Sequence, residues 1–268
     1  MPTIHLPASY YQQFDADVSL DVPGEAYGGW KTKELPLALQ HTALVVMHAW
    51  DTRSPQDYPG WHRAVEYTGR AQKIWETVFP PLLAAVRASP MAVMHVVAGG
   101  DYYKKHPIYH ELAAADDTRG PAGHVDPDPV YQQLQKLRHE DSFPGAHNSP
   151  DIRRGFAELD WPDQARPLDS EGVAENGRQL FTLCQRQHIN HLIYVGFAIN
   201  WCILLSPGGM NDMQQYGLIC STVRDAVTAV ENRETARQEL CKQIALWRVA
   251  LAFGFVFYSK DIIAALRA

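Results

Sequence analysis

The sequence predicts an α/β fold of three layers, in which a six-stranded, mostly parallel sheet carries helices on both faces. Two observations lead to this prediction. Short apolar runs alternate with segments of helical periodicity through much of the 268 residues, which is typical of βαβ units. The run at 43–47 is apolar at every position, as expected of a strand buried on both faces of a parallel sheet. Right-handed crossovers and the strand order 3-2-1-4-5-6 complete the prediction.

The regular elements follow one another along most of the chain. Pro80 and Pro81 are expected to interrupt and restart the first helix, because neither can donate a hydrogen bond in a helix interior. Ser259 is expected to be the N-cap of the last helix. Strands are predicted at 43–47, 91–98, 191–195, 218–223 and 251–257, and helices at 62–88, 176–188, about 202–215, 231–247 and 260–268.

Two stretches depart from this alternation. Residues 1–40 are rich in aromatic residues, glycine and proline, and are predicted to be an irregular N-terminal extension that wraps a single domain at 41–268. Residues 99–175 are rich in Gly, Pro, Asp and His, with one amphipathic patch at 130–137. A stretch of this length in a compact domain is usually a lid, a binding loop or an interface arm. It is therefore predicted to be a long insertion, with the third strand near its end.

Composition limits the classes of function. The formal net charge of −6 and the isoelectric point near 6.0 argue against a protein that binds nucleic acid or an anionic membrane. Residues 1–6 lack the basic and apolar regions of a signal peptide, and the longest apolar stretch, 244–258, is interrupted by Arg248. A cytoplasmic protein that does not contact membranes is expected.

The four cysteines form no CxxC pair, so reduced thiols are expected rather than a zinc site or a redox dithiol. Cys184, Cys220 and Cys241 fall within predicted helices or strands and are interpreted as small buried hydrophobic residues. Cys202 follows a predicted strand and a glycine, where a helix is expected to start. A helix N-terminus lowers the pKa of a thiol, and only the thiolate is a good nucleophile. Cys202 is therefore the candidate nucleophile, with a buried core thiol as the alternative.

His48 is the candidate partner of Cys202. Ligands bind beyond the carboxyl ends of the strands in open parallel sheets, at the point where the strand order reverses. In the order 3-2-1-4-5-6, the strands 43–47 and 191–195 are neighbours at that point, and their carboxyl ends lead to His48 and Cys202. An imidazole and a thiol placed together can form a catalytic pair. A histidine that only bonds the backbone is the alternative.

Three segments resemble one known family, the isochorismatase-like cysteine hydrolases, which include nicotinamidases and N-carbamoylsarcosine amidases. Residues 42–47 (TALVVM) resemble the opening "ALLVID" strand of the family. Residues 195–202 (VGFAINWC) resemble its nucleophile turn, "tGvatdvCV", and residues 216–226 (YGLICSTVRDA) resemble a later strand that ends in Asp-Ala. The resemblance covers about residues 40–100 and 175–265 and leaves the insertion unmatched.

This resemblance implies a hydrolase of small amides or related C–N bonds that needs no cofactor, with a triad of Asp, Lys and Cys. It also implies a cis peptide at Phe197–Ala198 and an oxyanion hole formed by the backbone amides of Ala198 and Cys202. Members of the family commonly assemble, so a homo-oligomer that binds a small-molecule substrate is expected. The insertion at 99–175 is a candidate interface.

Only the cysteine of the implied triad is matched. His48 stands where the family has its Asp, and Asp51, three residues later, is a second candidate or merely a cap for its loop. No Lys precedes the helix at 176–188, and Arg166 is the nearest cation. Two interpretations stay open. In one, His48 acts as the base for Cys202 at neutral pH. In the other, the triad is lost, and the protein binds a ligand or a partner without catalysis.

Other motifs are weaker. Asp101, His106 and His110 are loosely spaced, and Tyr103 breaks the Asp-x-His pattern through which nicotinamidases hold a metal, so loop residues are expected there rather than metal ligands. His110-Glu111 is not followed by the second His of HExxH, because position 114 is alanine. The sequence contains no GxGxxG, P-loop or GxSxG motif, which argues against nucleotide-binding proteins and serine hydrolases.

Overall fold

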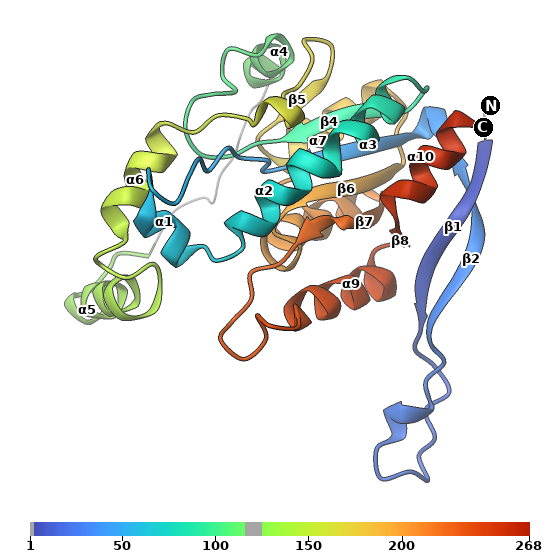
Figure 1. The fold of residues 1–268 in the computed structure, drawn as a ribbon, viewed down its shortest axis with the longest axis horizontal. Helices are drawn as coiled ribbons and strands as arrows, with labels where there is room; N and C mark the ends of the chain where they lie inside the picture. Colours follow the sequence, from blue (N-terminus) through green and yellow to red (C-terminus); the bar gives the residue numbers. More distant parts are fainter. Residues whose placement is uncertain (1–2, 116–124) are drawn as a thin grey trace.

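The computed structural model describes residues 3–115 and 125–268, and it shows one mixed sheet with helices on both faces (Figure 1). The strands are β1 Thr3–Gln12, β2 Gly29–Ala38, β3 Thr42–Met47, β4 Ala92–Val96, β5 Gly172–Ala174, β6 His191–Phe197, β7 Ile219–Thr228 and β8 Val256–Phe257. The α-helices are α1 Pro59–Ala64, α2 Thr68–Thr77, α3 Phe79–Arg87, α4 Pro107–Ala115, α5 Pro129–Leu137, α6 Ser149–Ala157, α7 Gly177–Arg186, α8 Met210–Met213, α9 Leu240–Ala252 and α10 Ser259–Arg267.

The sheet corrects the predicted one. It has eight strands rather than six, in the order β2-β1-β8-β7-β6-β3-β4-β5, so the order 3-2-1-4-5-6 does not describe the whole sheet. The pairs from β5 through β4, β3, β6 and β7 to β8 are all parallel, while β1 pairs antiparallel with both β8 and β2. The added antiparallel hairpin lies beyond β8, at one edge of the parallel part.

That hairpin is formed by the segment that was predicted to be irregular. Residues 3–12 and 29–38 pair over ten positions, and Leu6 and Ala8 are buried on one face. Pro7 and Pro36 hide the alternating pattern in the sequence, because proline within an alternating run argues against a strand interior. Pro36 is tolerated because β2 is the edge strand, and Pro7 lies in β1 outside its one registered pair with β8, Ser9 with Val256.

The core consists of two apolar layers on opposite faces of the sheet. Every residue of β3 is buried, and its side chains alternate between the layers. One layer joins Val45 to α7 and α9, and the other joins Leu44 to α2, α3 and α10. Because both faces are covered, β3 shows the continuous apolar run that predicted it.

Several element boundaries differ from the prediction. The expected helix at 202–215 is broken, because Gly208 takes a left-handed conformation between a π-helical turn and α8. Residues 233–239 form turns, since the Glu231 carboxylate accepts the N–H groups of Cys241 and Lys242 and so fixes the start of α9. α9 extends to Ala252 and so takes the first two residues of the strand predicted at 251–257, of which only the last two, Val256–Phe257, form β8.

Ser259 is not the N-cap of the last helix. Tyr258 occupies that position, and Ser259 is the first helical residue. Both the backbone N–H and the hydroxyl of Ser259 donate to the carboxylate of Asp225 on β7. The serine therefore ties the start of α10 to the sheet rather than closing the helix through its own side chain.

Among its described residues, the insertion contains three α-helices, α4 to α6, and it ends in β5, which is the third strand that the sequence predicted there. Glu171, directly before β5, accepts hydrogen bonds from Arg87 Nε (2.7 Å) and His95 Nε2 (2.9 Å). Burial opposes the charge on Glu171, but these hydrogen bonds lower the pKa of its carboxyl to about 2. The ion pair with Arg87 joins the residue before β5 to the end of α3, and the hydrogen bond from His95 joins it to β4. The described helices include none long and apolar enough to span a bilayer.

We expect Glu171→Gln to lower the free energy of unfolding by about 3 kcal/mol at neutral pH, because it leaves Arg87 and His95 without their carboxylate. The stabilisation from Glu171 is present above its unfolded pKa of 4.5 and is lost as the pH falls towards about 2. Urea unfolding of wild type and variant should therefore differ clearly at neutral pH and less in acid. Asp163→Asn, at an exposed carboxylate, is the matched control and should change little.

Candidate functional site

The site is built where the carboxyl ends of β3 and β6 touch. Gly196 lies opposite Met47 in the parallel register and has a φ of +117°. A Cβ at Gly196 would lie 2.0 Å from the Met47 carbonyl oxygen, so only glycine fits without separating the strands. This contact holds the residues that follow the two strands, His48 and the turn of Cys202, at the same end of the sheet, where the parallel strands finish.

Cys202 lies in a π-helical turn, Ile199–Ile203, that begins two residues after β6. The Phe197–Ala198 peptide is cis, as the family resemblance implied. The Ala198 carbonyl accepts the N–H groups of Trp201 (3.2 Å) and Ile203 (3.1 Å) and so closes the turn. π-turns are rare and are frequent at functional sites.

The accessibility of the four thiols differs. Cys184 and Cys220 are buried, as predicted, and burial raises the pKa of each to about 12. Cys241 is only half-buried, which corrects its interpretation as a core residue, and its sulfur lies 3.3 Å from Thr235 Oγ1. Cys202 is also half-buried and packs against the apolar layer of α7 and α9. Cys202 and Cys241 are thus the thiols that reagents can reach.

Asn200 was not predicted to be a site residue, yet its side chain binds the turn of Cys202 to a neighbouring loop. Its Nδ2 donates to the Val230 carbonyl (2.8 Å), and its Oδ1 accepts the Val230 N–H (2.9 Å). This two-bond clamp joins the turn of Cys202 to the loop after β7. An Asn at the start of a turn is a weak signal, and the partner thirty residues away is visible only in the fold.

His48 follows β3 with a φ of +47° and donates its backbone N–H to the Val96 carbonyl (3.0 Å). Its side chain is only 5% exposed and stacks on Trp50, with ring centroids 4.9 Å apart. Burial lowers the pKa of His48 to about 4, so the imidazole is neutral at neutral pH. Its Nδ1 is buried without a hydrogen-bond partner among the described residues.

Asp51, the second candidate base, shapes its own loop. Its Oδ1 accepts the Arg53 N–H (2.8 Å), and its backbone N–H donates to the Asp160 carbonyl (2.9 Å). This is the Asx-turn pattern of a loop cap. Among the described interactions of Asp51, none joins it to His48 or Cys202.

Neither the expected lysine nor Arg166 stands at the end of the third strand. Glu175 follows β5, and its Oε2 accepts the hydroxyls of Tyr103 (2.9 Å) and Tyr109 (2.8 Å). Arg166 lies earlier in the loop, where it pairs with Asp160 (2.8 Å). Glu175 was missed because the sequence alone did not place β5, and both tyrosines lie more than sixty residues away.

Tyr67 is a further neighbour of Cys202 that the sequence did not reveal. It precedes α2 and packs against the apolar layer formed by α2, α3 and α10. Burial, together with the negative charges of a Cys202 thiolate and Glu66, raises the pKa of the Tyr67 hydroxyl. The Tyr67 hydroxyl therefore stays protonated at neutral pH.

Two of the residues considered for a metal site, Asp101 and His106, each interact with a different partner. Asp101 pairs with Lys104, and His106 Nε2 lies 3.1 Å from the Leu168 carbonyl. In the parts of the chain that the structure describes, no three His, Cys, Asp or Glu side chains are grouped to hold a metal ion.

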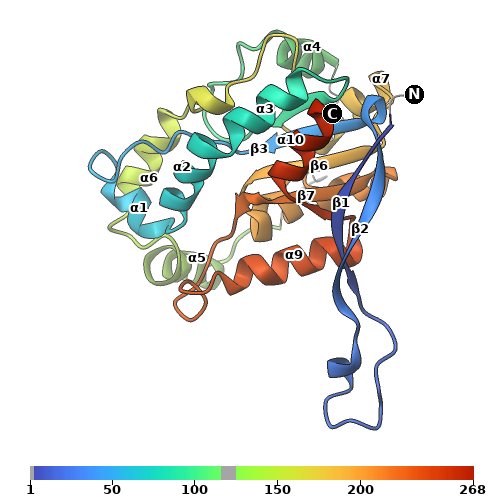
Figure 2. The ribbon, with the colours of Figure 1, turned by 45° about the vertical axis from the view of Figure 1, so that its right-hand side comes forward.

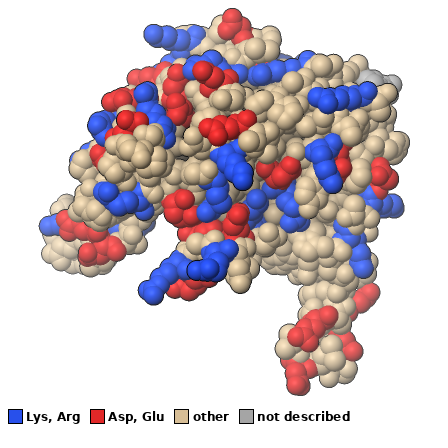
Figure 3. Space-filling view, viewed as in Figure 1, with Lys and Arg blue, Asp and Glu red and all other residues tan. Residues whose placement is uncertain are grey.

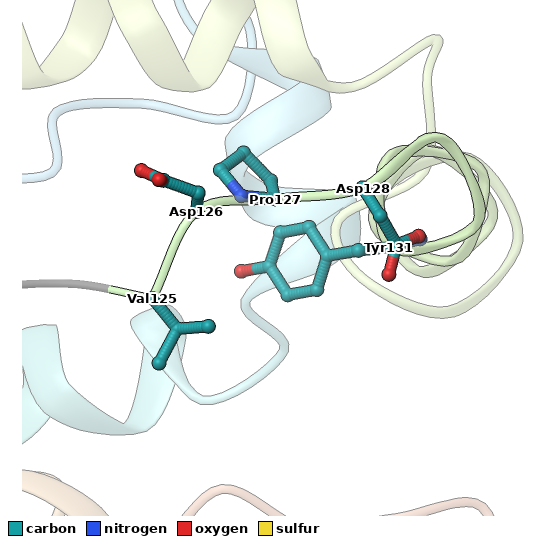
Figure 4. A pocket seen from close by; sticks show the side chains of 5 residues that line it. All are labelled: Val125, Asp126, Pro127, Asp128 and Tyr131. Carbon is teal, nitrogen blue, oxygen red and sulfur yellow. The ribbon is translucent and has the colours of Figure 1, made fainter.

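An open hollow of about 430 Å³ lies at the start of α5, apart from the edge where β3 and β6 end (Figure 4). One short segment supplies its lining, and Asp128 in that segment caps α5 by accepting the Tyr131 N–H (2.8 Å). None of the predicted site residues lines this hollow.

Comparison of the chain with known proteins gives likenesses of fold only. No family model matches the sequence. No curated protein matches it either. The solved structures that are similar in fold include cysteine hydrolases and isochorismatase-family proteins, which is the class suggested by the sequence segments above.

Three of these structures show how low the sequence identity and the structural similarity to this chain are. A cysteine hydrolase from Pseudomonas syringae pv. phaseolicola is 14% identical, with a TM-score of 0.48 over 87% of this chain and 95% of that one. An isochorismatase-like hydrolase from Alkaliphilus metalliredigens is 12% identical, with a TM-score of 0.48 over 85% and 99%. The YcaC gene product from Escherichia coli, described as an octameric hydrolase of unknown specificity, is 10% identical, with a TM-score of 0.40 over 86% and 81%.

We expect Gly196→Ala to destabilise the fold by about 3 kcal/mol or more, because the new Cβ meets backbone and the φ is strained. The matched control is Gly69→Ala in α2, where a Cβ would meet nothing within 4 Å. That change should stabilise the protein by about 1 kcal/mol, since alanine is the better helix former. Thermal and urea unfolding of both variants measure the effect, and equal stabilities would contradict the close contact.

Proposed function

We propose that this protein hydrolyses a small amide or a related C–N bond, with Cys202 as nucleophile and His48 as general base. One observation carries the proposal. A half-buried thiol in a π-turn and a neutral imidazole, whose Nδ1 has no hydrogen-bond partner among the described residues, follow two neighbouring strands that are held in contact by Gly196. These are the parts that nucleophilic catalysis by cysteine requires.

The reaction follows from these groups. The neutral imidazole of His48 accepts the thiol proton while the sulfur of Cys202 bonds to the carbonyl carbon. The carbonyl oxygen becomes an oxyanion, which the backbone N–H groups of Ala198 and Cys202 stabilise. The C–N bond then breaks, and the imidazolium returns its proton to the leaving nitrogen. Water, deprotonated by His48, releases the acid from the thioester and regenerates the thiol.

Burial makes His48 a weak base but a good proton donor, because the charged imidazolium is disfavoured in its apolar surroundings. This favours rapid return of the proton to the leaving group. We assign Asp51 a role in shaping the loop, since its carboxylate caps the Arg53 backbone. Glu175 is engaged by two tyrosines and is assigned no proton transfer. A cytoplasmic setting, which keeps the Cys202 thiol reduced, fits this chemistry.

A second function is a ligand-binding or assembly protein on the same fold without catalysis. The low pKa of His48 favours it, because a weak base deprotonates a thiol poorly. The residue that follows β5 favours it too, because Glu175 stands there in place of the lysine that the family resemblance implies. The two functions differ in whether Cys202 is more reactive than a comparable thiol.

Labelling with iodoacetamide separates these functions. For the hydrolase, we expect Cys202 to react at neutral pH about tenfold or more faster than Cys241, the other half-buried thiol. His48→Ala should slow the labelling of Cys202 and leave that of Cys241 unchanged. Mass spectrometry of the labelled peptides gives both rates in one sample, and equal rates would remove the hydrolase proposal.

Turnover is tested by ammonia release from a panel of small primary amides. For any amide that wild type hydrolyses, Cys202→Ser should abolish turnover, and His48→Ala should lower it by about 100-fold or more. The activity should rise as the pH increases through about 4, because His48 must be neutral to accept the thiol proton. Cys241→Ser is the control and should keep full activity. Full activity of Cys202→Ser would contradict the assignment.

A further inference from the structure

The hairpin of β1 and β2 continues into residues 13–28, here called the arm, which projects beyond the rest of the molecule (Figures 1 and 2). The base of the arm is fixed to α9 of its own chain. Gln13 Oε1 accepts the indole N–H of Trp247 (2.8 Å), and Tyr11 contacts Trp247 edge-on, with centroids 6.3 Å apart. The arm therefore leaves the body in a defined direction beside α9.

The arm is ordered by its own turns, yet it presents an apolar surface to solvent. The Asp17 N–H donates to the Pro23 carbonyl (3.2 Å), and the Asp17 carboxylate caps Ser19. Four large apolar side chains on it are 43% to 88% exposed: Phe14, Val18, Leu20 and Val22. Several exposed large apolar side chains on one protruding element are characteristic of a contact with another protein.

The charge of the arm has one sign. It contains four acidic residues and no Lys or Arg: Asp15, Asp17, Asp21 and Glu25. Figure 3 shows this concentration of acidic side chains at the tip of the arm. The surface that receives the arm should therefore be apolar with basic residues around it.

The outer face of α9 has this character. Leu240, Ile244 and Leu251 are 40% to 54% exposed and share one side of the helix with the half-buried Trp247, at spacings of three and four residues. The opposite side of α9, with Leu246 and Val249, is buried in the core. Two exposed arginines, Arg237 just before the helix and Arg248 within it, supply positive charge.

We propose that the arm of one copy of this chain lies on the outer face of α9 of a second copy, in a reciprocal two-fold dimer. The apolar side chains of the arm cover the exposed leucine and isoleucine residues, and its carboxylates face Arg237 and Arg248. Each arm is fixed beside the α9 helix of its own chain. A two-fold rotation that places one arm on the partner's α9 therefore also places the partner's arm on the first α9, and the assembly closes as a dimer.

The edge strand β2 makes a dimer by strand addition less favourable. Lys31 and Lys33 are exposed on it, and Pro36 removes a backbone donor. Lysine and proline are features that block edge-to-edge pairing. The sheet edge is thus protected, and the arm is the part that stays apolar and available.

A designed disulfide tests the geometry. In a background in which Ser replaces the half-buried Cys202 and Cys241, Val18→Cys with Ile244→Cys should give a covalent dimer under oxidising conditions, seen by intact mass and non-reducing gels. The matched control is Val18→Cys with Leu134→Cys, which places the second thiol on the exposed face of α5 and should not cross-link. A cross-link within one chain, or an equal yield for the control pair, would overturn the proposal.

The oligomeric state gives an independent test on the otherwise unaltered chain. Analytical ultracentrifugation should show a dimer whose dissociation constant rises about 100-fold or more when Val18→Asp and Leu20→Asp are combined. Leu168→Asp, at an exposed leucine in the insertion, is the control and should leave the dimer intact. Wild type that is monomeric at all concentrations would refute the dimer, and an assembly that ignores the arm substitutions would refute the role of the arm.

Discussion

The close contact between Gly196 and the Met47 carbonyl is the constraint on which the site depends. It sets the separation of β3 and β6 at their carboxyl ends, and both strand ends lead directly into the residues of interest. With any larger residue at 196 the strands would part, the π-turn would shift, and Cys202 would move relative to His48. Because Gly196 has no side chain, β3 and β6 can stay in contact at their carboxyl ends. The residues that follow them, His48 and the turn of Cys202, then lie at the same end of the sheet.

Burial then decides the character of those groups. The same loss of hydration that raises the pKa of Cys184 and Cys220 lowers that of His48, because burial disfavours whichever form carries the charge. Glu171 keeps its charge because Arg87, His95 and the Leu168 N–H donate hydrogen bonds to it. At neutral pH the His48 imidazole is therefore neutral and the Tyr67 hydroxyl stays protonated.

How much could be predicted depended on where each contact partner lies in the chain. β3 and the turn of Cys202 could be predicted from the sequence, because a strand buried on both faces and a glycine before a turn leave local patterns. The hairpin of β1 and β2 was missed because Pro7 and Pro36 break its alternation. Glu175 and the Asn200 clamp were missed because their partners lie thirty or more residues away, so no local pattern records them.

The pairing of β1 with β8 has a consequence for the order in which the protein is made and folds. Ser9 pairs with Val256, so the hairpin cannot join β8 until residue 256 has left the ribosome. Contacts between residues so distant in sequence form late, because the loop that separates them must close first. During synthesis the arm is therefore present before its anchor at Trp247 exists, and nascent chains that translate slowly expose its apolar side chains longest.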